Sequence, residues 1–244
     1  MLLPPIADLD ALARTRHAWH TVAEHVLAAA RHRATGRIGL QVTPRGCGTP
    51  PYERDGAIEE VRIAGRDLVV RIGDEATTTP LTTLADAAAV VGIEPGGPSE
   101  VYRLATPLEP DAPLLVDDGA ASALAAWFEL TWSVLGELGA ESGRDAAPSQ
   151  LTLWPEHFDA AVVLGDEAHG ARGTFGASPG DSEHPEPYLY VTYLTEMPAD
   201  PFWNDAAFAG ASLSHSAISR AADARDATSA FYREGRDRLN AAQG

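Results

Sequence analysis

The chain of 244 residues contains no lysine, because all 18 of its basic residues are arginine. A lysine amine forms the Schiff base with pyridoxal phosphate and holds nucleotide phosphates in P-loop proteins and kinases. We therefore expect no pyridoxal phosphate (PLP) enzyme, no P-loop for an NTP and no kinase. The single cysteine, Cys47, likewise excludes an internal disulfide, a cysteine zinc site and an Fe–S cluster held by this chain alone.

Long apolar runs and positive charge are also scarce. The most apolar stretch, 120–138, carries Glu129 and Glu137, so we expect no membrane span. The first residues lack a basic region, which predicts no signal peptide. With 35 acidic residues and a net charge of -17, the surface repels nucleic acid and anionic membranes. We predict a cytoplasmic protein with an acidic surface, from a bacterium whose genome is GC-rich. We expect neither a nucleic-acid partner nor a membrane partner.

The order of predicted elements divides the chain near its middle. Five prolines and two adjacent glycines in 93–118 indicate a connector between lobe one, about 1–92, and lobe two, 119–244. Lobe one is predicted to contain a long helix, a strand, a Gly/Pro-rich loop, a hairpin and a short helix, at 8–34, 37–43, 44–52, 59–72 and 82–91. Lobe two is predicted to contain a helix, four strands and a final helix, at 120–139, 150–154, 158–164, 171–176, 187–194 and 224–240.

The two lobes follow the same order of helix, antiparallel strands and helix. This order lacks the strand–helix alternation of a parallel doubly wound sheet. We predict a single compact α+β protein of residues 1–244, with two similar lobes, each an antiparallel sheet covered by helices. The repeated order also raises the hypothesis of a distant internal duplication.

Several motifs occur in the same order as in a known family. They are His17-Ala18-Trp19, Val42-Thr43-Pro44-Arg45-Gly46 with Thr49-Pro50, Trp154-Pro155 with Phe158-Asp159, Ser178-Pro179-Gly180-Asp181, and Pro185-Glu186-Pro187-Tyr188 with Tyr190. In these motifs the chain resembles a bacterial domain-of-unknown-function family that is common in actinobacteria. The resemblance spans both lobes, and it implies no activity, cofactor or catalytic residue.

His17, His20 and Glu24 lie on one flank of the first predicted helix, at spacings of three and four residues. This geometry suits two or three ligands of a metal ion. It differs from the H-E-x-x-H of zinc proteases, whose glutamate directly follows the first histidine. The alternative is that these side chains form hydrogen bonds at the edge of the core.

Six residues are candidates for ligand binding: Arg45, Trp154, His157, Asp159, Asp181 and Tyr188. His157 and Asp159 are two residues apart, so on a strand they would share one face and could orient a base. Arg45, beside a glycine-rich loop, suits an anion clamp. We expect these segments to meet at a cleft between the lobes, although a buried polar pair at His157–Asp159 and a turn stabilised by Asp181 are the structural alternatives.

Three further patterns predict structure rather than chemistry. Gly176-Ala177-Ser178-Pro179-Gly180 matches the G-x-S-x-G of serine hydrolases, but Pro179 has no N–H for the oxyanion hole. The acidic loop 181–186 lacks the spacing of a calcium-binding EF-hand. Cys47, next to Arg45, is interpreted as a small apolar side chain in a tight turn rather than a reactive thiol.

Three hypotheses for function remain. The first is a small-molecule-binding or accessory protein, with aromatic side chains near polar turns. The second is a metal-dependent, hydrolase-like enzyme that uses His17, His20, Glu24, His157 and Asp159. The third is a protein-interaction module with no small-molecule site.

Overall fold

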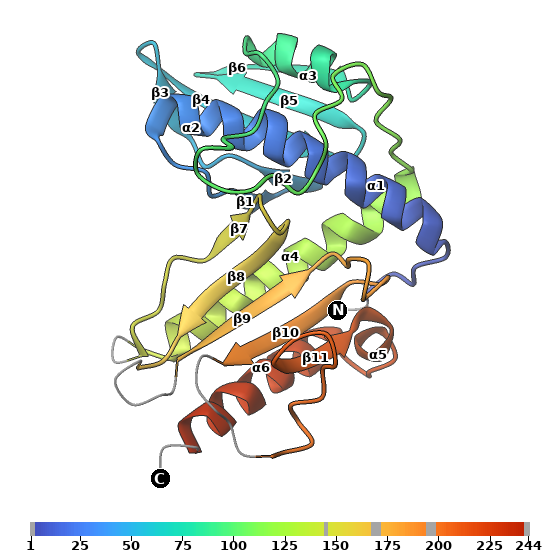
Figure 1. The fold of residues 1–244 in the computed structure, drawn as a ribbon, viewed down its shortest axis with the longest axis vertical. Helices are drawn as coiled ribbons and strands as arrows, with labels where there is room; N and C mark the ends of the chain where they lie inside the picture. The colour runs from blue at the N-terminus through green and yellow to red at the C-terminus, as the bar shows by residue number, and fades with distance from the viewer. Residues whose placement is uncertain (1–2, 144–145, 167–171, 194–198, 242–244) are drawn as a thin grey trace. The chain divides into compact units, whose positions relative to one another are not determined.

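A computed structural model describes residues 3–143, 146–166, 172–193 and 199–241. The chain forms two compact units (Figure 1). The N-terminal unit contains Ile6–Glu129 and Leu153–Phe158, and the C-terminal unit contains Met1–Pro5, Leu130–Thr152 and Asp159–Gly244. The division falls inside one helix, α4 (Asp118–Glu141), rather than in the expected connector, and all of 93–118 belongs to the N-terminal unit.

The N-terminal unit begins with a continuous helix made of α1 (Leu9–Val22), the π-helical turn η1 (Ala23–Ala28) and α2 (Ala29–Thr35). The Asp8 side chain caps its start, and Gly36 ends it with a left-handed φ of 71°. This confirms the predicted helix. The predicted buried stripe is also confirmed, since its members are at most 2% exposed: Leu12, Trp19, Ala23, Val26 and Ala30.

Six antiparallel strands follow, in the order β1-β2-β4-β5-β6 with β3 beside β4. They are β1 (Gln41–Thr43), β2 (Gly46–Gly48), β3 (Tyr52–Arg54), β4 (Ala57–Ala64), β5 (Asp67–Ile72) and β6 (Glu75–Pro80). The β4–β5 hairpin was predicted, but the loop expected at 44–52 was wrong because it contains β2 and the start of β3. Gly48 fits there because a Cβ would lie only 2.9 Å from Cα of Arg62 on β4.

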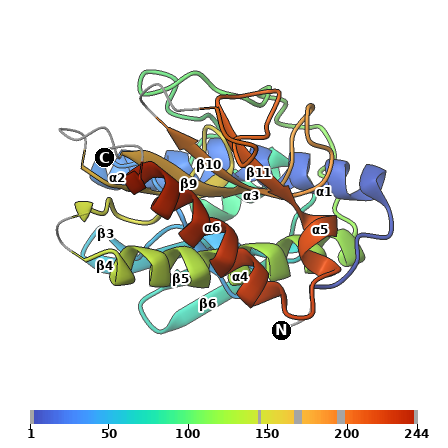
Figure 2. The same cartoon turned by 90° about the horizontal axis from the view of Figure 1, so that it is seen from below.

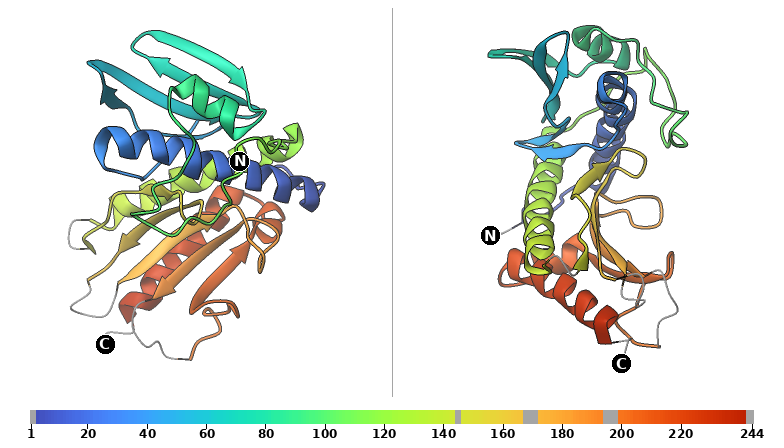
Figure 3. Two further views of the ribbon diagram at one scale, coloured as in Figure 1. Left: turned by 45° about the horizontal axis from the view of Figure 1, so that its top comes forward. Right: turned by 90° about the vertical axis from the view of Figure 1, so that its left-hand side faces the viewer.

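The long helix lies between this sheet and the connector. The helix α3 (Leu84–Val91) lies on the same side of the sheet as the long helix, and the connector runs along the side of the long helix that faces away from the sheet (Figure 3). Consequently residues 21–30 are all buried, including Glu24 and His25. A helix that is covered on every side has to bury its polar residues with partners.

The C-terminal unit contains the end of α4, a five-stranded antiparallel sheet in the order β11-β10-β9-β8-β7, and two helices. The elements are β7 (Thr152–Trp154), β8 (Asp159–Leu164), β9 (Gly173–Ser178), β10 (Tyr188–Tyr193), β11 (Gly210–Ser214), α5 (His215–Ser219) and α6 (Ala224–Ala241). Of these, β11 and α5 were not predicted. The end of α4 and α6 cover one face of the sheet (Figures 1 and 2), and Arg233 on α6 pairs with Glu141 on α4 at 2.7 Å.

The predicted fold class is confirmed, since the protein is α+β with two similar antiparallel sheets. The C-terminal sheet follows chain order, whereas in the N-terminal sheet β2 lies next to β4 and β3 is off the main path, and the duplication stays a prediction. Within the described ranges, no helix combines the length and the apolar character needed to cross a membrane.

Candidate functional site

The face of the C-terminal sheet that α4 and α6 do not cover carries polar and aromatic side chains. Directly paired residues share a face of a sheet, and here Tyr188 pairs with Ser178 and Tyr190 with Gly176. Asp159 precedes the Ala160–Ala177 pair and therefore lies beside Ser178. We call Asp159, Ser178, Tyr188 and Tyr190 the tyrosine face. It includes two of the predicted ligand-binding residues.

The Tyr190 side chain crosses a whole strand to reach Asp159. Its hydroxyl donates to Oδ2 of Asp159, which is 7% exposed. The ring passes over Gly176, where a Cβ would lie 2.6 Å from Cε1 of Tyr190 and closer still to the hydroxyl end. Burial first, and then the charge of Asp159, raise the pKa of Tyr190 well above its usual value. The phenol is therefore a permanent donor to the carboxylate.

Asp181 organises the loop that joins β9 to β10. Its Oδ1 accepts from the backbone N–H of Glu183 at 2.8 Å and of His184 at 2.7 Å, and its Oδ2 accepts from the Tyr188 hydroxyl at 2.7 Å. Burial works to raise the pKa of Asp181, but these hydrogen bonds outweigh it and the pKa is lowered. Gly180 has the positive φ, 100°, that the predicted turn needs. The predicted local role of Asp181 is confirmed.

His184, which the sequence offered as one of four possible metal ligands in the loop 181–186, joins the same network of hydrogen bonds instead. Its Nε2 lies 2.9 Å from Oδ2 of Asp205, its Nδ1 lies 3.4 Å from Oδ1 of Asp181, and its ring lies over Tyr188 at 4.2 Å. Phe208 covers both tyrosines, with ring centroids 6.4 Å and 6.1 Å from them. Only the dense Pro and acidic content of 181–187 marked this loop in the sequence. This network holds two loops against the sheet, the loop 181–187 and the loop that carries Asp205 and Phe208. Its carboxylates form hydrogen bonds with its own tyrosine and histidine side chains.

The other three predicted ligand residues belong to the N-terminal unit. Trp154 is 37% exposed at the end of β7, and Arg45 is exposed in the β1–β2 turn with a positive φ of 66°. The prediction that His157 and Asp159 share a strand face is wrong. His157 is exposed in the turn between β7 and β8, where Phe158 takes a left-handed φ of 54°, and Asp159 bonds to Tyr190 instead. A cleft shared by all six residues stays a prediction.

Glu24 serves the connector instead of a metal. Its carboxylate accepts from the backbone N–H groups of Ala105 at 3.0 Å and Thr106 at 2.7 Å, and from the Thr106 hydroxyl at 2.6 Å. His25 beside it accepts from the Gly97 N–H at Nδ1, at 3.0 Å, and contacts the Thr106 carbonyl through Nε2, at 3.2 Å. Sequence reasoning missed His25, whose full burial depends on the connector covering the helix.

His20 lies next to this pair but bonds elsewhere. Its Nε2 contacts the Pro155 carbonyl at 2.7 Å, and its ring stacks on Phe158 at 5.1 Å. Burial lowers the pKa of His20, against the opposing charge of Glu24 at 3.9 Å. His17 is exposed. Across the part of the chain that the structure describes, no three His, Cys, Asp or Glu side chains form a group able to hold a metal ion, so these three do not come together as ligands.

Cys47 behaves as the sequence interpretation expects. It is fully buried in β2, and burial raises the pKa of its thiol to about 12. A thiol with such a pKa is almost entirely protonated near neutral pH and is a poor nucleophile.

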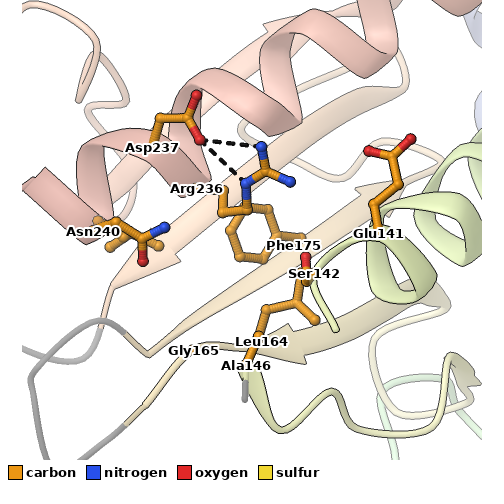
Figure 4. Close-up of a pocket in the computed structure, with 10 residues that line it drawn as sticks. Glu141, Ser142, Ala146, Leu164, Gly165, Phe175, Arg236, Asp237 and Asn240 are labelled. Carbon is orange, nitrogen blue, oxygen red and sulfur yellow. Dashed lines mark hydrogen bonds and ion pairs between the residues drawn. The ribbon is translucent and has the colours of Figure 1, made fainter. Parts of the chain in front are cut away.

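A cavity of about 400 Å³ lies in the C-terminal unit, between the ends of α4 and α6 and the β8–β9 end of the sheet (Figure 4). The buried apolar side chains of Leu164, Phe175 and Leu239 lie behind it, and its surface is contributed by polar and apolar groups in similar measure. Arg236, Asp237 and Asn240 line it from α6 (Figure 4). Ser142 and Glu141 line the α4 side. Such a cavity can hold a small molecule that has one apolar and one polar part.

Comparisons of the chain with protein-family models, with curated proteins and with solved structures gave no match. The resemblance to the actinobacterial family therefore stays a prediction, and function has to be argued from the cavity and the side chains around it.

Proposed function

We propose that the protein binds a small organic molecule in the cavity between the ends of α4 and α6. The volume of this cavity, about 400 Å³, is the observation that carries the proposal. Ligand pockets typically occupy roughly 300–1,000 Å³ and combine apolar walls with a few polar groups. This cavity has a volume in that range, and both apolar residues, such as Leu164 and Phe175, and polar residues, such as Arg236, line it.

Arg236 suggests the chemical class of the ligand. It donates through Nε and one Nη to Oδ1 of Asp237, at 3.2 Å and 3.1 Å. The Asp237 side chain is 68% exposed, and exposed ion pairs add little stability. A ligand carboxylate can therefore replace Asp237 at small cost and meet the flat guanidinium with two hydrogen bonds. We expect a small acid with an apolar body of several carbons.

The hydrolase-like alternative gains no support, because its proposed metal ligands do not form a group among the described side chains. The interaction module is supported by a different region, which is treated below.

The test is a binding screen with benzoate and hexanoate, by ligand-observed NMR and by the shift in melting temperature. Ser142→Phe should fill the cavity and abolish binding, and Arg236→Gln should weaken it. Ser122→Phe is a matched control, because both hydroxyls donate to the carbonyl four residues earlier, at 2.7 Å and 2.8 Å, and Ser122 is exposed. No binding of either acid, or equal binding by Ser142→Phe, would reject the proposal.

A further inference from the structure

A second, smaller cavity forms a groove in the N-terminal unit, between α1 and the connector residues 107–115. Its volume is about 110 Å³. The connector side is made of proline, alanine and leucine, including Pro107 and Leu114, with one charged residue, Glu109. On the helix side, the Thr21 hydroxyl donates to the His17 carbonyl at 2.8 Å, so Thr21 has no free donor to offer to the groove. The groove is therefore mainly apolar.

Both walls of the groove are held in place without a partner. The helix wall belongs to the long helix, which is buried among its neighbours. The connector wall is tied to the start of α3, because Leu114 donates its N–H to Thr82 at 2.8 Å and Ala85 donates its N–H to Pro110 at 2.9 Å. A preformed groove spends less free energy on ordering when a ligand binds.

An exposed leucine adds apolar surface at the groove, since Leu115 lines it and is 56% exposed. The groove itself has room for about one aliphatic side chain. A small free acid would leave most of Leu115 in water, whereas a bound protein segment would cover it and gain from its burial.

The rim of the groove carries one arginine, Arg14, that forms no ion pair within the described residues, in a chain whose net charge is -17. His17 lies beside it on the helix side. Glu109 lies on the opposite rim. The helix side therefore attracts a carboxylate, and Glu109 opposes it from across the groove.

We infer that this groove docks an acidic segment of another protein, which inserts one aliphatic side chain and places a neighbouring carboxylate on Arg14. The apolar volume selects the aliphatic group, the exposed Leu115 favours a segment over a small acid, and Arg14, which has no ion-pair partner among the described residues, selects the negative charge. This site lies in a different unit from the proposed small-molecule cavity, so the two proposals fail independently.

The experiment uses the full chain and the labelled peptide acetyl-Ser-Asp-Leu-Asp-Ser-amide, with NMR titration and fluorescence anisotropy at low salt. We expect resonance shifts at the groove and weaker binding as salt is raised. Arg14→Gln should weaken binding about fivefold, the size of one exposed ion pair. Glu109→Gln should strengthen it, and Leu115→Ser should weaken it.

Two matched controls should leave binding unchanged. Arg33→Gln removes the same charge from the same continuous helix, roughly 28 Å away along its axis. Ile58→Ser removes an equally exposed aliphatic side chain from β4. Four results would overturn the inference: no binding at millimolar peptide, equal weakening by Arg33→Gln, undiminished binding of the peptide with glycine in place of leucine, or equal affinity of 4-methylpentanoate measured from resonance shifts at the groove and not at the C-terminal cavity.

Discussion

Glu24 in the N-terminal unit and Asp159 in the C-terminal unit are both buried carboxylates that join segments far apart along the chain, but their donors differ. In the N-terminal unit, Glu24 is fully buried and accepts from two backbone N–H groups and one hydroxyl of the connector. In the C-terminal unit, Asp159 and Asp181 accept from the hydroxyls of Tyr190 and Tyr188.

The comparison predicts that the carboxylates of the two units contribute different amounts to the free energy of unfolding. Backbone donors at Ala105 and Thr106 remain when Glu24 is removed, and the N–H of the buried Thr106 is then left without an acceptor. At Asp181, by contrast, the Tyr188 hydroxyl and the backbone N–H groups are part-buried or exposed, so water can replace the carboxylate. Loss of one acceptor should therefore cost more in the N-terminal unit than in the C-terminal unit.

The largest effect is expected for Glu24→Ala. Removing the only carboxylate that these connector groups share should lower the free energy of unfolding by about 3 kcal/mol, measured by urea denaturation. Trypsin should also cut faster after Arg103, which lies in the connector. Glu94→Ala, an exposed glutamate in the same connector, is the control and should change neither measurement. A loss below about 1 kcal/mol would contradict the assigned role of Glu24.

Gly176→Ala tests the crossing of β9 by Tyr190. The added Cβ overlaps the Tyr190 ring, so the ring has to leave Asp159, and we expect a loss of about 2 kcal/mol. Near-UV circular dichroism should report the displaced tyrosine. Gly136→Ala is the matched control, because its Cβ would meet only Leu151, at 3.9 Å, in the interior of α4. That variant should gain up to about 1 kcal/mol from helix propensity. Equal effects of the two substitutions would refute the close-approach argument.

Asp181→Ala should lower the free energy of unfolding by about 1 kcal/mol, since its backbone partners lie partly in water. Binding of benzoate or hexanoate should be unaffected, because Asp181 does not line the cavity. Ser182→Ala, at an exposed position of the same loop, controls for general changes in the loop. An unchanged melting temperature together with lost binding would show that Asp181 binds the ligand and does not stabilise its loop.

The smallest effect concerns pH. The pKa of His20 is lowered by burial in the folded state, so the unfolded chain binds its proton more readily. The stabilising contribution is complete above the unfolded pKa of about 6.5 and is lost as the pH falls below it. From pH 7.5 to 5.5 we expect a loss of several tenths of a kcal/mol, to about 1 kcal/mol. His20→Gln should flatten this slope in part, because burial also lowers the pKa of His215. An unchanged slope would rule out His20 as a source.

Much of the fold was predictable because its signals are local. The cap at Asp8, the apolar stripe through Trp19 and the glycine at Gly36 define the long helix without any distant contact. The run 188–193 predicted β10 in the same way. The strand β6 (Glu75–Pro80) was missed because it is nearly all exposed and therefore lacks the alternation that marks a half-buried strand.

The candidate sites were less predictable, since they depend on partners far away in the chain. Asp181 was assigned correctly because its partners lie within seven residues. The position of His157 was predicted wrongly, because residues 155–158 form a turn between β7 and β8 and do not continue a strand.

The sequence by itself determined every helix except α5, most of the strands, the α+β class and the exclusion of lysine-dependent chemistry, because each follows from composition or from contacts between near neighbours. Only the tertiary structure decided that Glu24 binds the connector, that Tyr190 passes over Gly176 to Asp159, and where the two cavities lie. The physical reason is that a buried polar group takes the partner that packing brings to it, and packing joins residues 31 to 82 positions apart in these cases.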